Sequence, residues 1–435
     1  MHIKIEHISK IEGYAGFIAD IADGKIKKVR VDIKEGARLL EGILRDRNIY
    51  EVSHITARIC GICPVVHTLA SLKALEKALD IDVSPTTLLL RRLMMMGQII
   101  NSHALHLFFF SLSDFLGFNK DLAMVKQHSR RAREALAVRD FGNLLVEVIG
   151  GRSIHPVTPT IGGFLKLPDK RKLRHLFNIS TKVLADAQRL AELFIGLKYP
   201  YFVRSSPYAS LHNAKEYAFY DGLIKTPNDA KASPTDFMKI IKEYQPENSV
   251  VKRALYQGQP YMVGAISRLN NNHSQLNPHA KRLLKQAGLL LPSLNPFHNI
   301  PAQAVEVVHC VEETRELLKR TLHKSFDVND IAEQKDLVET KLRSLKGTAQ
   351  ATAAVEAPRG ALYYFYEFGG NGKVVNCNII TPTSQNMARL ERDLEEYLPS
   401  LLGRMTTANV CDKNCQDKIK MLVRAYDPCL TCATH

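Results

Sequence analysis

Hydrophobic and polar residues alternate near the start of the chain, which is the pattern of a strand with one buried face. Ile3 and Ile5 begin this pattern, and the segment 26–33 repeats it. Between them, Ala22-Asp23-Gly24 has the composition of a tight turn. Residues 1–35 are therefore predicted to form a β-meander.

From about Val65 the hydrophobic period changes to that of a helix. Leucines recur every three or four residues from Leu69 to Leu79, and this helix is expected to end before Pro85. The same period predicts further helices near residues 87–116, 122–148, 170–197, 273–290, 300–325, 385–402 and 413–424. The expected fold class is therefore mainly α, a long-helix bundle with small N-terminal and C-terminal β elements.

The stretch 200–270 breaks both patterns. Its segments YQPENS and YQGQPYMVG contain Pro, Gly and Asn, which indicate loops and short strands at the surface. Two β-like runs, 361–368 and 373–380, flank the turn sequence GGNG and predict a hairpin in the C-terminal part of the chain.

The 435 residues contain no low-complexity linker and no repeat of fixed period. We therefore expect one domain over 1–435. Within it we distinguish the β-meander 1–35, a helical core 60–200, an irregular surface region 200–270 and a C-terminal segment 356–435. The longest apolar run, 105–116, is shorter than the ~20 residues that a membrane span needs, so we predict a buried helix and no direct membrane span.

With 45% hydrophobic and 24% charged residues, the chain has the balance of a soluble globular protein with a sizeable core. Its formal net charge of +15 would suit an acidic protein, a nucleic acid or an anionic cofactor. Tryptophan, zinc-finger spacing and RNA-binding signatures are absent, so a protein partner and no nucleic acid are expected. The segment 1–14 lacks the apolar core of a secretory signal, so we expect no export signal in this chain.

The eight cysteines favour metal binding or catalysis over a disulfide framework in a chain of this size. Two C-x-x-C pairs, Cys60 with Cys63 and Cys429 with Cys432, would supply four thiolates, which suit zinc, nickel or an iron–sulfur cluster. Zinc ribbons separate their pairs by ~15 to 20 residues, whereas the step from Cys63 to Cys429 is 366 residues. The two ends of the chain would therefore meet around one ion. A structural zinc site, or a redox disulfide at each pair, is the alternative.

The sequences around the two pairs resemble the two signature motifs of nickel–iron hydrogenase large subunits: RICGICPVVH at 58–67 and DPCLTCATH at 427–435. Shorter matches are KIEGY at 10–14, SHALH at 102–106, EAPRG at 356–360 and ITPT at 380–383. PYMVGAISRLNNN at 260–272 and the ITPT segment are similar to the soluble, bidirectional, sulfhydrogenase-like branch of that family. The resemblance covers most of the chain and implies the helix-rich fold of the family, with 356–435 as its C-terminal active-site segment.

In this family four cysteines hold nickel, and here these would be Cys60, Cys63, Cys429 and Cys432. The resemblance implies that Cys63 and Cys432 also bridge to an iron that carries cyanide and carbon monoxide. Dihydrogen would be oxidised reversibly to protons and electrons, with the terminal thiolate of Cys429 as proton acceptor and Glu12 as the proton relay. The alternative for Glu12 is a surface carboxylate at the end of a strand.

Arg359 matches the family's arginine above the open metal position, and Pro358 would help to hold it. A buried arginine needs carboxylate partners, and Asp114 and Asp427 match family carboxylates around this pocket. Thr383 matches the position that hydrogen-bonds a cyanide ligand.

His67 matches a histidine beside the bridging sulfur, where such groups tune a metal. His103 and His106 lie three positions apart on one helical face; they could form a ligand pair, but histidines satisfied within a core are more common. The four other cysteines are expected to be structural thiols and not a second metal site: Cys310, Cys377, Cys411 and Cys415.

Glu41, the backbone carbonyl of Ile379 and His435 match the family's ligands to a second cation, magnesium or a second iron. The chain ends at His435, where the maturation protease of the family cuts after nickel insertion. The resemblance therefore implies a maturation protease and nickel-insertion factors as partners.

The remaining cysteines form no cluster motif, so electrons are expected to leave through an iron–sulfur small subunit. In the soluble branch, flavin and iron–sulfur subunits pass them to an acceptor such as NAD(P); this chain has no Gly-x-Gly-x-x-Gly motif of its own. We expect a cytoplasmic location. The alternatives are a structural four-cysteine zinc protein and an electron-transfer subunit like that of respiratory complex I, which shares the fold without the four cysteines.

Overall fold

The computed structural model describes residues 2–22, 25–118, 121–324, 326, 335–402 and 411–435. Strands β1 (His2–Ile5), β2 (Ala15–Ala22) and β3 (Lys25–Ile33) form an antiparallel sheet in the order β1-β2-β3, the predicted meander. Residues 23 and 24 of the predicted turn lie outside the described residues. Ile5 pairs with Phe17 in register, and both are buried.

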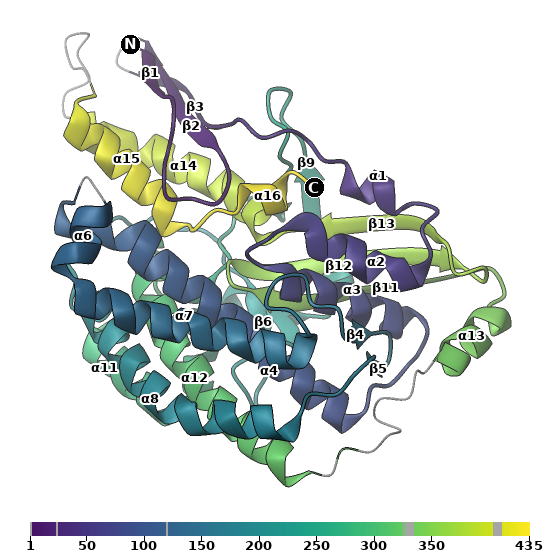
Figure 1. Ribbon diagram of the computed structural model, residues 1–435. Coiled ribbons are helices and arrows are strands. Elements are labelled where there is room, and N and C mark those ends of the chain that lie inside the picture. The colour runs from purple at the N-terminus through teal and green to yellow at the C-terminus, as the bar shows by residue number, and fades with distance from the viewer. Residues whose placement is uncertain (1, 23–24, 119–120, 325, 327–334, 403–410) are drawn as a thin grey trace.

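Long helices form a bundle in the lower part of Figure 1: α4 (Pro85–Leu105), α7 (Ser129–Gly150), α8 (Lys170–Ile195) and α12 (Asn299–His323). Helices α4 and α7 cross closely because each has a glycine at the crossing. A Cβ at Gly97 would lie 2.8 Å from the carbonyl oxygen of Gly142, so any larger residue would push the helices apart.

The run predicted as one helix over 87–116 changes its winding part-way. After α4, residues His106–Ser111 form a π-helical segment before α5 (Leu112–Leu116). Such segments are frequent at functional sites. By length and composition Pro85–Leu116 could cross a membrane, but 78% of its most apolar window is buried inside the protein, as in the core helix of a bundle.

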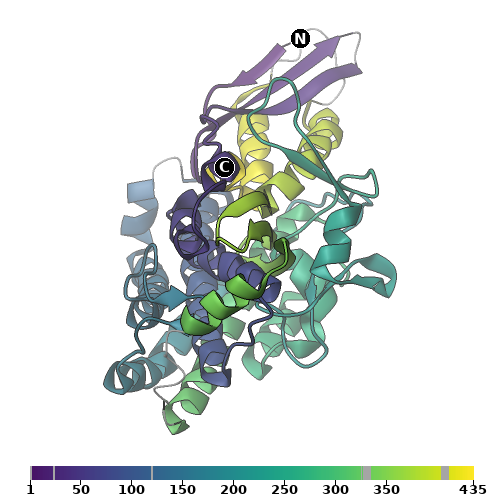
Figure 2. The same cartoon turned by 90° about the vertical axis from the view of Figure 1, so that its right-hand side faces the viewer.

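A second antiparallel sheet consists of β11 (Thr348–Ala357), β12 (Gly360–Gly369) and β13 (Val374–Ile380), with β12 in the centre. Helix α3 (Pro64–Ala78) packs on it, and Figure 2 shows the sheet from another side. The predicted hairpin corresponds to β12 and β13. Strand β11 is missed by the sequence pattern because its segment TAQATAAVEA is rich in alanine, which has a low strand preference.

The other described helices are α1 (Leu40–Leu44), α2 (Ile49–Thr56), α6 (Asp121–Gln127), α9 (Pro234–Ile240), α10 (Ala265–Asn272), α11 (Pro278–Ala287), α13 (Lys335–Ser344), α14 (Pro382–Leu402), α15 (Lys413–Ala425) and α16 (Leu430–Ala433). Short strands pair as β4 (Pro159–Thr160) with β5 (Gly163–Phe164), as β6 (Ser210–His212), β7 (Leu223–Lys225) and β8 (Lys231–Ala232), and as β9 (Ile241–Tyr244) with β10 (Arg253–Tyr256). The short strands within 200–270 agree with the predicted short strands. The predicted surface position is wrong for the end of this stretch, because Tyr261 to Val263 and the first turn of α10 are buried in the core.

Helices α8, α12, α14 and α15 confirm the predictions over 170–197, 300–325, 385–402 and 413–424, with residue 325 outside the described residues. The prediction over 273–290 is too long. Helix α11 begins only at Pro278, which occupies its first turn, and ends before Gly288, whose φ of 61° stops the helix.

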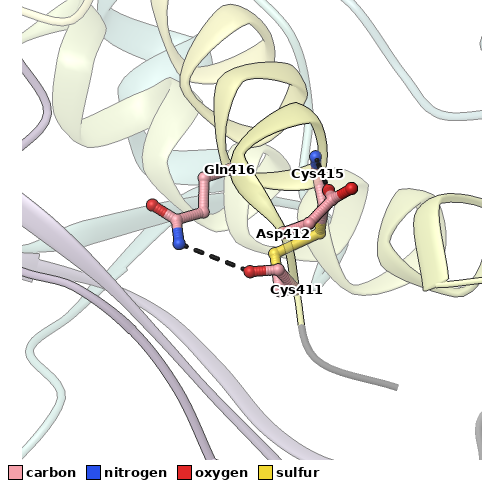
Figure 3. The surroundings of a disulfide bond; sticks show 4 residues. All are labelled: Cys411, Asp412, Cys415 and Gln416. Carbon is pink, nitrogen blue, oxygen red and sulfur yellow. Dashed lines mark hydrogen bonds between the residues drawn. A yellow bond between two sulfur atoms is a disulfide. The ribbon is translucent and has the colours of Figure 1, made fainter.

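Cys411 and Cys415 form a disulfide bond at the start of α15 (Figure 3). The prediction of structural thiols is therefore wrong for this pair, whereas Cys310 and Cys377 are free and buried. Asp412 caps α15 by accepting a hydrogen bond from the Cys415 amide at 2.8 Å. Cys411 lies just before this cap and Cys415 in the first helical turn, so the cap holds the two sulfurs at the same end of α15.

Candidate metal centre

The four cysteines of the two C-x-x-C pairs come together because both ends of the chain fold onto one place. Cys60 follows a short 3-10 turn, and Cys63 is the residue directly before α3. Cys429 directly precedes α16, and Cys432 lies within that short helix. In Figure 1 the C-terminus accordingly lies in the body of the molecule, beside elements from the first part of the chain.

The four sulfur atoms form one buried cluster. Sγ of Cys63 lies 3.1 Å from Sγ of Cys432, and Sγ of Cys60 lies 3.5 Å from Sγ of Cys429. The sulfurs of Cys429 and Cys432 are 3.0 Å apart, and all four lie within 4.8 Å of one another. All four are free thiols, so the structure does not contain a disulfide at either pair.

The chemistry of these thiols fits a bound cation. Burial raises the pKa of the Cys429 and Cys432 thiols well above the usual value, whereas hydrogen bonding to Cys429 lowers the pKa of Cys60. Four buried thiols cannot all ionise side by side unless a positive charge compensates them. A soft metal ion supplies that charge and prefers sulfur ligands, so the residues present fit nickel and iron.

Glu12 lies directly against the cluster. Its Oε2 is 3.0 Å from Sγ of Cys429, and its carboxylate accepts hydrogen bonds from the Thr431 amide at 3.1 Å and the Thr431 hydroxyl at 2.7 Å. The carbonyl of Glu12 also accepts a hydrogen bond from the Leu430 amide at 2.9 Å. Glu12 is half-buried, so a surface carboxylate at a strand end does not describe it. A carboxylate at this distance can exchange a proton with the thiol.

Arg359 lies in the turn between β11 and β12 and is 5% exposed. Its Nη2 donates to Oδ1 of Asp427 at 2.8 Å, and its Nε donates to the Asp427 backbone carbonyl at 2.6 Å. Burial opposes the charged form, but Asp427 and then the cysteine thiols raise the pKa of Arg359 above its usual range. The guanidinium therefore remains charged beside the cluster.

Glu41, Ile379 and His435 meet at a second place. Oε1 of Glu41 accepts a hydrogen bond from the Ile379 amide at 2.9 Å, and Nε2 of His435 lies 2.8 Å from the Ile379 carbonyl oxygen. Nε2 of His435 is 3.8 Å from Oε1 of Glu41. Lys252, which the sequence did not single out, forms an ion pair with the other Glu41 oxygen at 2.9 Å. The carboxylate and carbonyl oxygens of this set suit a hard cation.

His67 connects the cluster to the second sheet. Its Nε2 lies 3.5 Å from Sγ of Cys432, and its Nδ1 shares a hydrogen bond of 2.7 Å with the hydroxyl of Tyr364 on β12. Burial lowers the pKa of His67 to about 3, so the imidazole is neutral at physiological pH. Tyr364 is a residue that the sequence motifs did not reveal, because it lies in a strand with an ordinary aromatic pattern.

Comparison with known proteins agrees with this arrangement. A family model described as nickel-dependent hydrogenase matches residues 38–143 and 203–435. The chain belongs to the nickel-dependent hydrogenase family. It is the large, catalytic subunit of a nickel–iron hydrogenase and hence an oxidoreductase. This membership decides against the structural zinc protein and the complex I-like subunit.

This hydrogenase subunit is 34% identical to sulfhydrogenase 1 subunit alpha of Pyrococcus furiosus, over 100% of this chain and 97% of that protein. It is 23% identical to NAD-reducing hydrogenase HoxS subunit beta of Cupriavidus necator, over 100% of this chain and 94% of that protein. A solved NAD+-reducing NiFe hydrogenase in the H2-reduced state has a TM-score of 0.87 and 26% identity, covering 100% of this chain and 99% of that chain. The mainly α fold is therefore confirmed.

The two carboxylates that could partner Arg359 in this hydrogenase are separated in the structure. Asp427 binds Arg359, whereas Asp114 pairs with Arg424, whose Nε also donates to the Ser9 carbonyl at 2.8 Å. Burial raises the pKa of Asp114. Asp114 thus joins α5 to α15, and Arg424 continues the connection to the N-terminal segment at Ser9. A role of Asp114 at the active-site pocket stays a prediction.

Thr383 contacts the backbone of Cys429, whereas Pro358 contacts the side chain of Arg268. The Thr383 hydroxyl accepts a hydrogen bond from the Cys429 amide at 3.0 Å, which fixes the orientation of that cysteine. The Pro358 carbonyl accepts a hydrogen bond from Arg268 at 2.9 Å. A hydrogen bond from Thr383 to a cyanide ligand stays a prediction.

His103 and His106 are hydrogen-bonded core residues, as expected. Nε2 of His103 lies 2.8 Å from Oε2 of Glu306, and Nδ1 of His106 lies 2.6 Å from Oε1 of Gln303. Gln303 also donates to Asp427 at 3.1 Å and so supports the carboxylate that binds Arg359. Sequence reasoning missed Gln303 and Glu306; their signal is two polar residues, three positions apart, in an otherwise apolar stretch of α12.

Proposed function

We propose that this subunit catalyses the reversible heterolytic oxidation of dihydrogen to protons and electrons at a nickel–iron centre. The proposed ligands are the cysteines Cys60, Cys63, Cys429 and Cys432. The main support is one arrangement: four buried thiols, a carboxylate in contact with one of them, and a charged guanidinium at the edge of the cluster.

Nickel and iron, the iron carrying cyanide and carbon monoxide, supply the redox and Lewis-acid chemistry when bound. We assign Cys60 and Cys429 to nickel alone, and Cys63 and Cys432 to both metals. The neutral imidazole of His67, 3.5 Å from the Cys432 sulfur, would adjust the electron density on that ligand.

Proton transfer is assigned to Cys429 and Glu12. Cys429 occupies the position of the terminal thiolate that the family resemblance assigns as proton acceptor, and a nearby carboxylate faces its sulfur. The next acceptor is the Glu12 carboxylate at 3.0 Å, within the range for direct transfer. Two hydrogen bonds from Thr431 hold this carboxylate in place, so it can pass the proton outward without losing contact with the thiol.

Arg359 is assigned an electrostatic role at the open side of the centre. Its charge is held by two hydrogen bonds to Asp427, so it needs no reorganisation when charge develops on a bound substrate. Pro358 restricts the turn that carries it. Thr383 and Asp114 are proposed to contribute to the same pocket.

We further propose that magnesium, or a second iron, binds to Glu41, the Ile379 carbonyl and His435. These groups lie close together and include two oxygen donors. Such a cation would tie the C-terminal residue to β13 and α1.

Electrons are proposed to leave through an iron–sulfur small subunit. Outside the four-thiol cluster, the cysteines of this chain are two isolated buried thiols and one disulfide, which cannot hold an iron–sulfur cluster. The names of the relatives, a sulfhydrogenase subunit alpha and an NAD-reducing hydrogenase subunit beta, support further subunits and an acceptor such as NAD(P). Flavin and iron–sulfur subunits are proposed from the family resemblance. A cytoplasmic location, a maturation protease, nickel-insertion factors and action of residues 1–435 as one domain belong to the same proposal.

The test is infrared spectroscopy of the matured, purified protein together with elemental analysis. We expect one nickel per chain and stretching bands of cyanide and carbon monoxide. Cys60→Ser should lose nickel and the bands, whereas Cys310→Ser, at a buried free thiol outside the cluster, should keep both. Zinc in place of nickel in correctly matured protein, without such bands, would refute the proposal.

A further inference from the structure

The turn that carries Arg359 lacks the conformation that a two-residue hairpin loop favours. Ala357 and Gly360 pair in register, so Pro358 and Arg359 form the whole loop between β11 and β12. Favoured loops of this length have a positive φ at the first central residue. The ring of Pro358 instead holds φ near about −65°, and Arg359 is not among the described residues with positive φ. The turn therefore needs support from outside the hairpin.

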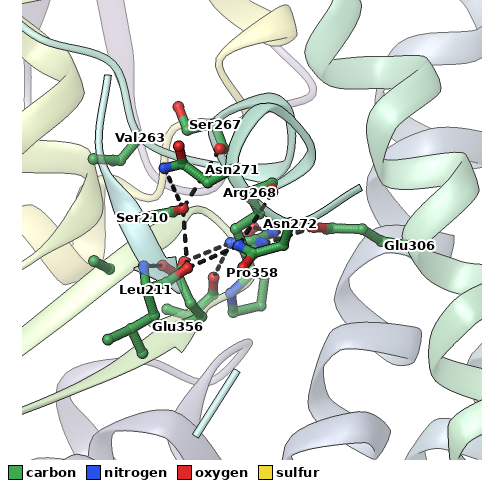
Figure 4. A network of polar contacts seen from close by, with 12 residues as sticks. Ser210, Leu211, Val263, Ser267, Arg268, Asn271, Asn272, Glu306, Glu356 and Pro358 are labelled. Atoms are coloured by element: carbon green, nitrogen blue, oxygen red, sulfur yellow. Dashed lines mark hydrogen bonds and ion pairs between the residues drawn. The ribbon is translucent and has the colours of Figure 1, made fainter. Parts of the chain in front are cut away.

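Arg268 on α10 supplies this support (Figure 4). Its Nη1 donates to the Ala357 carbonyl and its Nη2 to the Pro358 carbonyl, each at 2.9 Å. Figure 4 shows Arg268 between the strand that carries Glu356 and the helix that carries Glu306. These carbonyls belong to the two residues before Arg359, so a displacement of Arg268 would be passed to that residue.

Two carboxylates anchor Arg268, which is completely buried. Glu306 binds it in a bidentate manner, with both N···O distances at 2.7 Å, and Glu356 accepts from Nη1 at 2.9 Å. Glu306 is itself held by His103 at 2.8 Å and by the Tyr217 hydroxyl at 2.6 Å. Bidentate, charge-assisted bonds give strong geometric control over the position of Arg268.

The start of α10 also lies so close to the turn that the two must move together. A Cβ at Gly264 would lie 3.4 Å from the Arg359 carbonyl oxygen, and a Cβ at Gly360 would lie 2.5 Å from Cγ2 of Val263. No side chain fits between the two segments. The position of Arg268 on α10 is thus coupled to the position of the turn.

We propose that Arg268 is a positioning residue for the dihydrogen reaction. Through the carbonyls of Ala357 and Pro358, it fixes the direction in which Arg359 presents its guanidinium to the four-thiol centre. The inference rests on the proposed role of Arg359 and adds to it the group that holds this side chain in place.

The experiment is a double-mutant cycle of Arg268→Lys and Arg359→Lys in the purified hydrogenase complex, with rates expressed per nickel. Lysine keeps the charge at position 268 but cannot contact both carboxylates and both carbonyls with one nitrogen. We expect Arg268→Lys to lower kcat by about 10- to 100-fold, the effect of a catalytic group displaced by about 1 Å, with KM for dihydrogen unchanged. In the Arg359→Lys background the same change should have no further effect, because it acts through Arg359.

Arg91→Lys is the matched control. Arg91 is also completely buried, binds Glu76 in a bidentate manner with Nη1 at 2.7 Å, and donates to the Thr160 carbonyl at 3.0 Å, but it does not touch the site. It should lose thermal stability to a similar degree and keep kcat. Hydrogen exchange in a peptide spanning 356–360 should be faster in Arg268→Lys than in wild type, and unchanged in Arg91→Lys.

Three outcomes are decisive. Equal losses of kcat in both backgrounds, or full kcat in Arg268→Lys at full nickel content, would overturn the positioning role. Full kcat in Arg359→Lys alone would instead overturn the proposed role of Arg359, which is a separate failure. If Arg268→Lys does not accumulate, Glu306→Asp replaces it under the same criteria, because it keeps every charge and withdraws the anchor of Arg268 by one methylene.

Discussion

Replacing Glu356 by glutamine should make the stability of the protein less dependent on pH. Glu356 is completely buried and accepts hydrogen bonds from Nη1 of Arg268 at 2.9 Å and from the Leu211 amide at 2.7 Å. Burial outweighs both contacts and raises the pKa of Glu356 from its ordinary value of 4.5 to about 7. The folded protein therefore keeps this proton over a pH range in which the unfolded chain has lost it.

The sign and size of the effect follow from this difference in pKa. A group with a raised pKa in the folded state contributes stability that is fully present below pH 4.5 and is lost as the pH rises to about 7. At about 1.36 kcal/mol for each pKa unit, the loss is about 3 kcal/mol. For 435 residues, an unfolding entropy of about 2.1 cal/mol/K per residue converts this free energy to about 3 °C in Tm.

The assay is scanning calorimetry of Glu356→Gln and wild type at one scan rate between pH 5 and pH 8. Glutamine does not titrate, so the Tm of the variant minus that of wild type should rise by about 2–3 °C across this range. If the amide group itself alters Tm by the same amount at every pH, the change in the Tm difference across the pH range is unaffected. Ser267→Ala, a neighbouring buried substitution without a titrating group, should give a flat difference. A flat difference for Glu356→Gln as well would refute burial as the dominant influence on this carboxyl.

Three other substitutions address the proposed centre itself. Glu12→Gln removes the carboxylate that accepts the proton, so hydrogen–deuterium exchange catalysed by the complex should fall by about 10²- to 10⁴-fold; Glu12→Asp should retain part of it, and an unchanged rate in Glu12→Gln would exclude the relay. Tyr364→Phe removes the hydroxyl 2.7 Å from Nδ1 of His67. The lost hydrogen bond should cost about 1–3 kcal/mol of unfolding free energy and should shift the infrared bands at unchanged nickel content. Unshifted bands would mean that this hydroxyl does not tune the centre. Elemental analysis should show that His435→Ala loses the second cation, whereas His323→Ala, at the end of α12, keeps it. If both variants keep this cation, its ligands are other residues.

The residues closest to the proposed metals were predictable because chemistry fixes their local spacing. The C-x-x-C spacing lets two thiolates reach one ion, which makes Cys60 with Cys63 and Cys429 with Cys432 visible in the sequence. The long helices were predictable for a similar reason, since burial of one face imposes a period of three to four residues. Short helices such as α1 and α2 span too few turns to show that period.

The groups that hold these residues in place follow a different constraint. A buried charge must be met by an opposite charge, but that partner can come from any element that the fold brings near. Asp114 and Asp427 were therefore equally suitable partners for Arg359 in the sequence, and only the fold assigns Asp427 to it and Asp114 to Arg424. The partners of Arg268 were equally invisible in the sequence. Two of them are the carbonyl groups of a proline-containing turn that lacks a favourable hairpin geometry. Arg268 reaches these carbonyls only because the fold places α10 against β11 and β12.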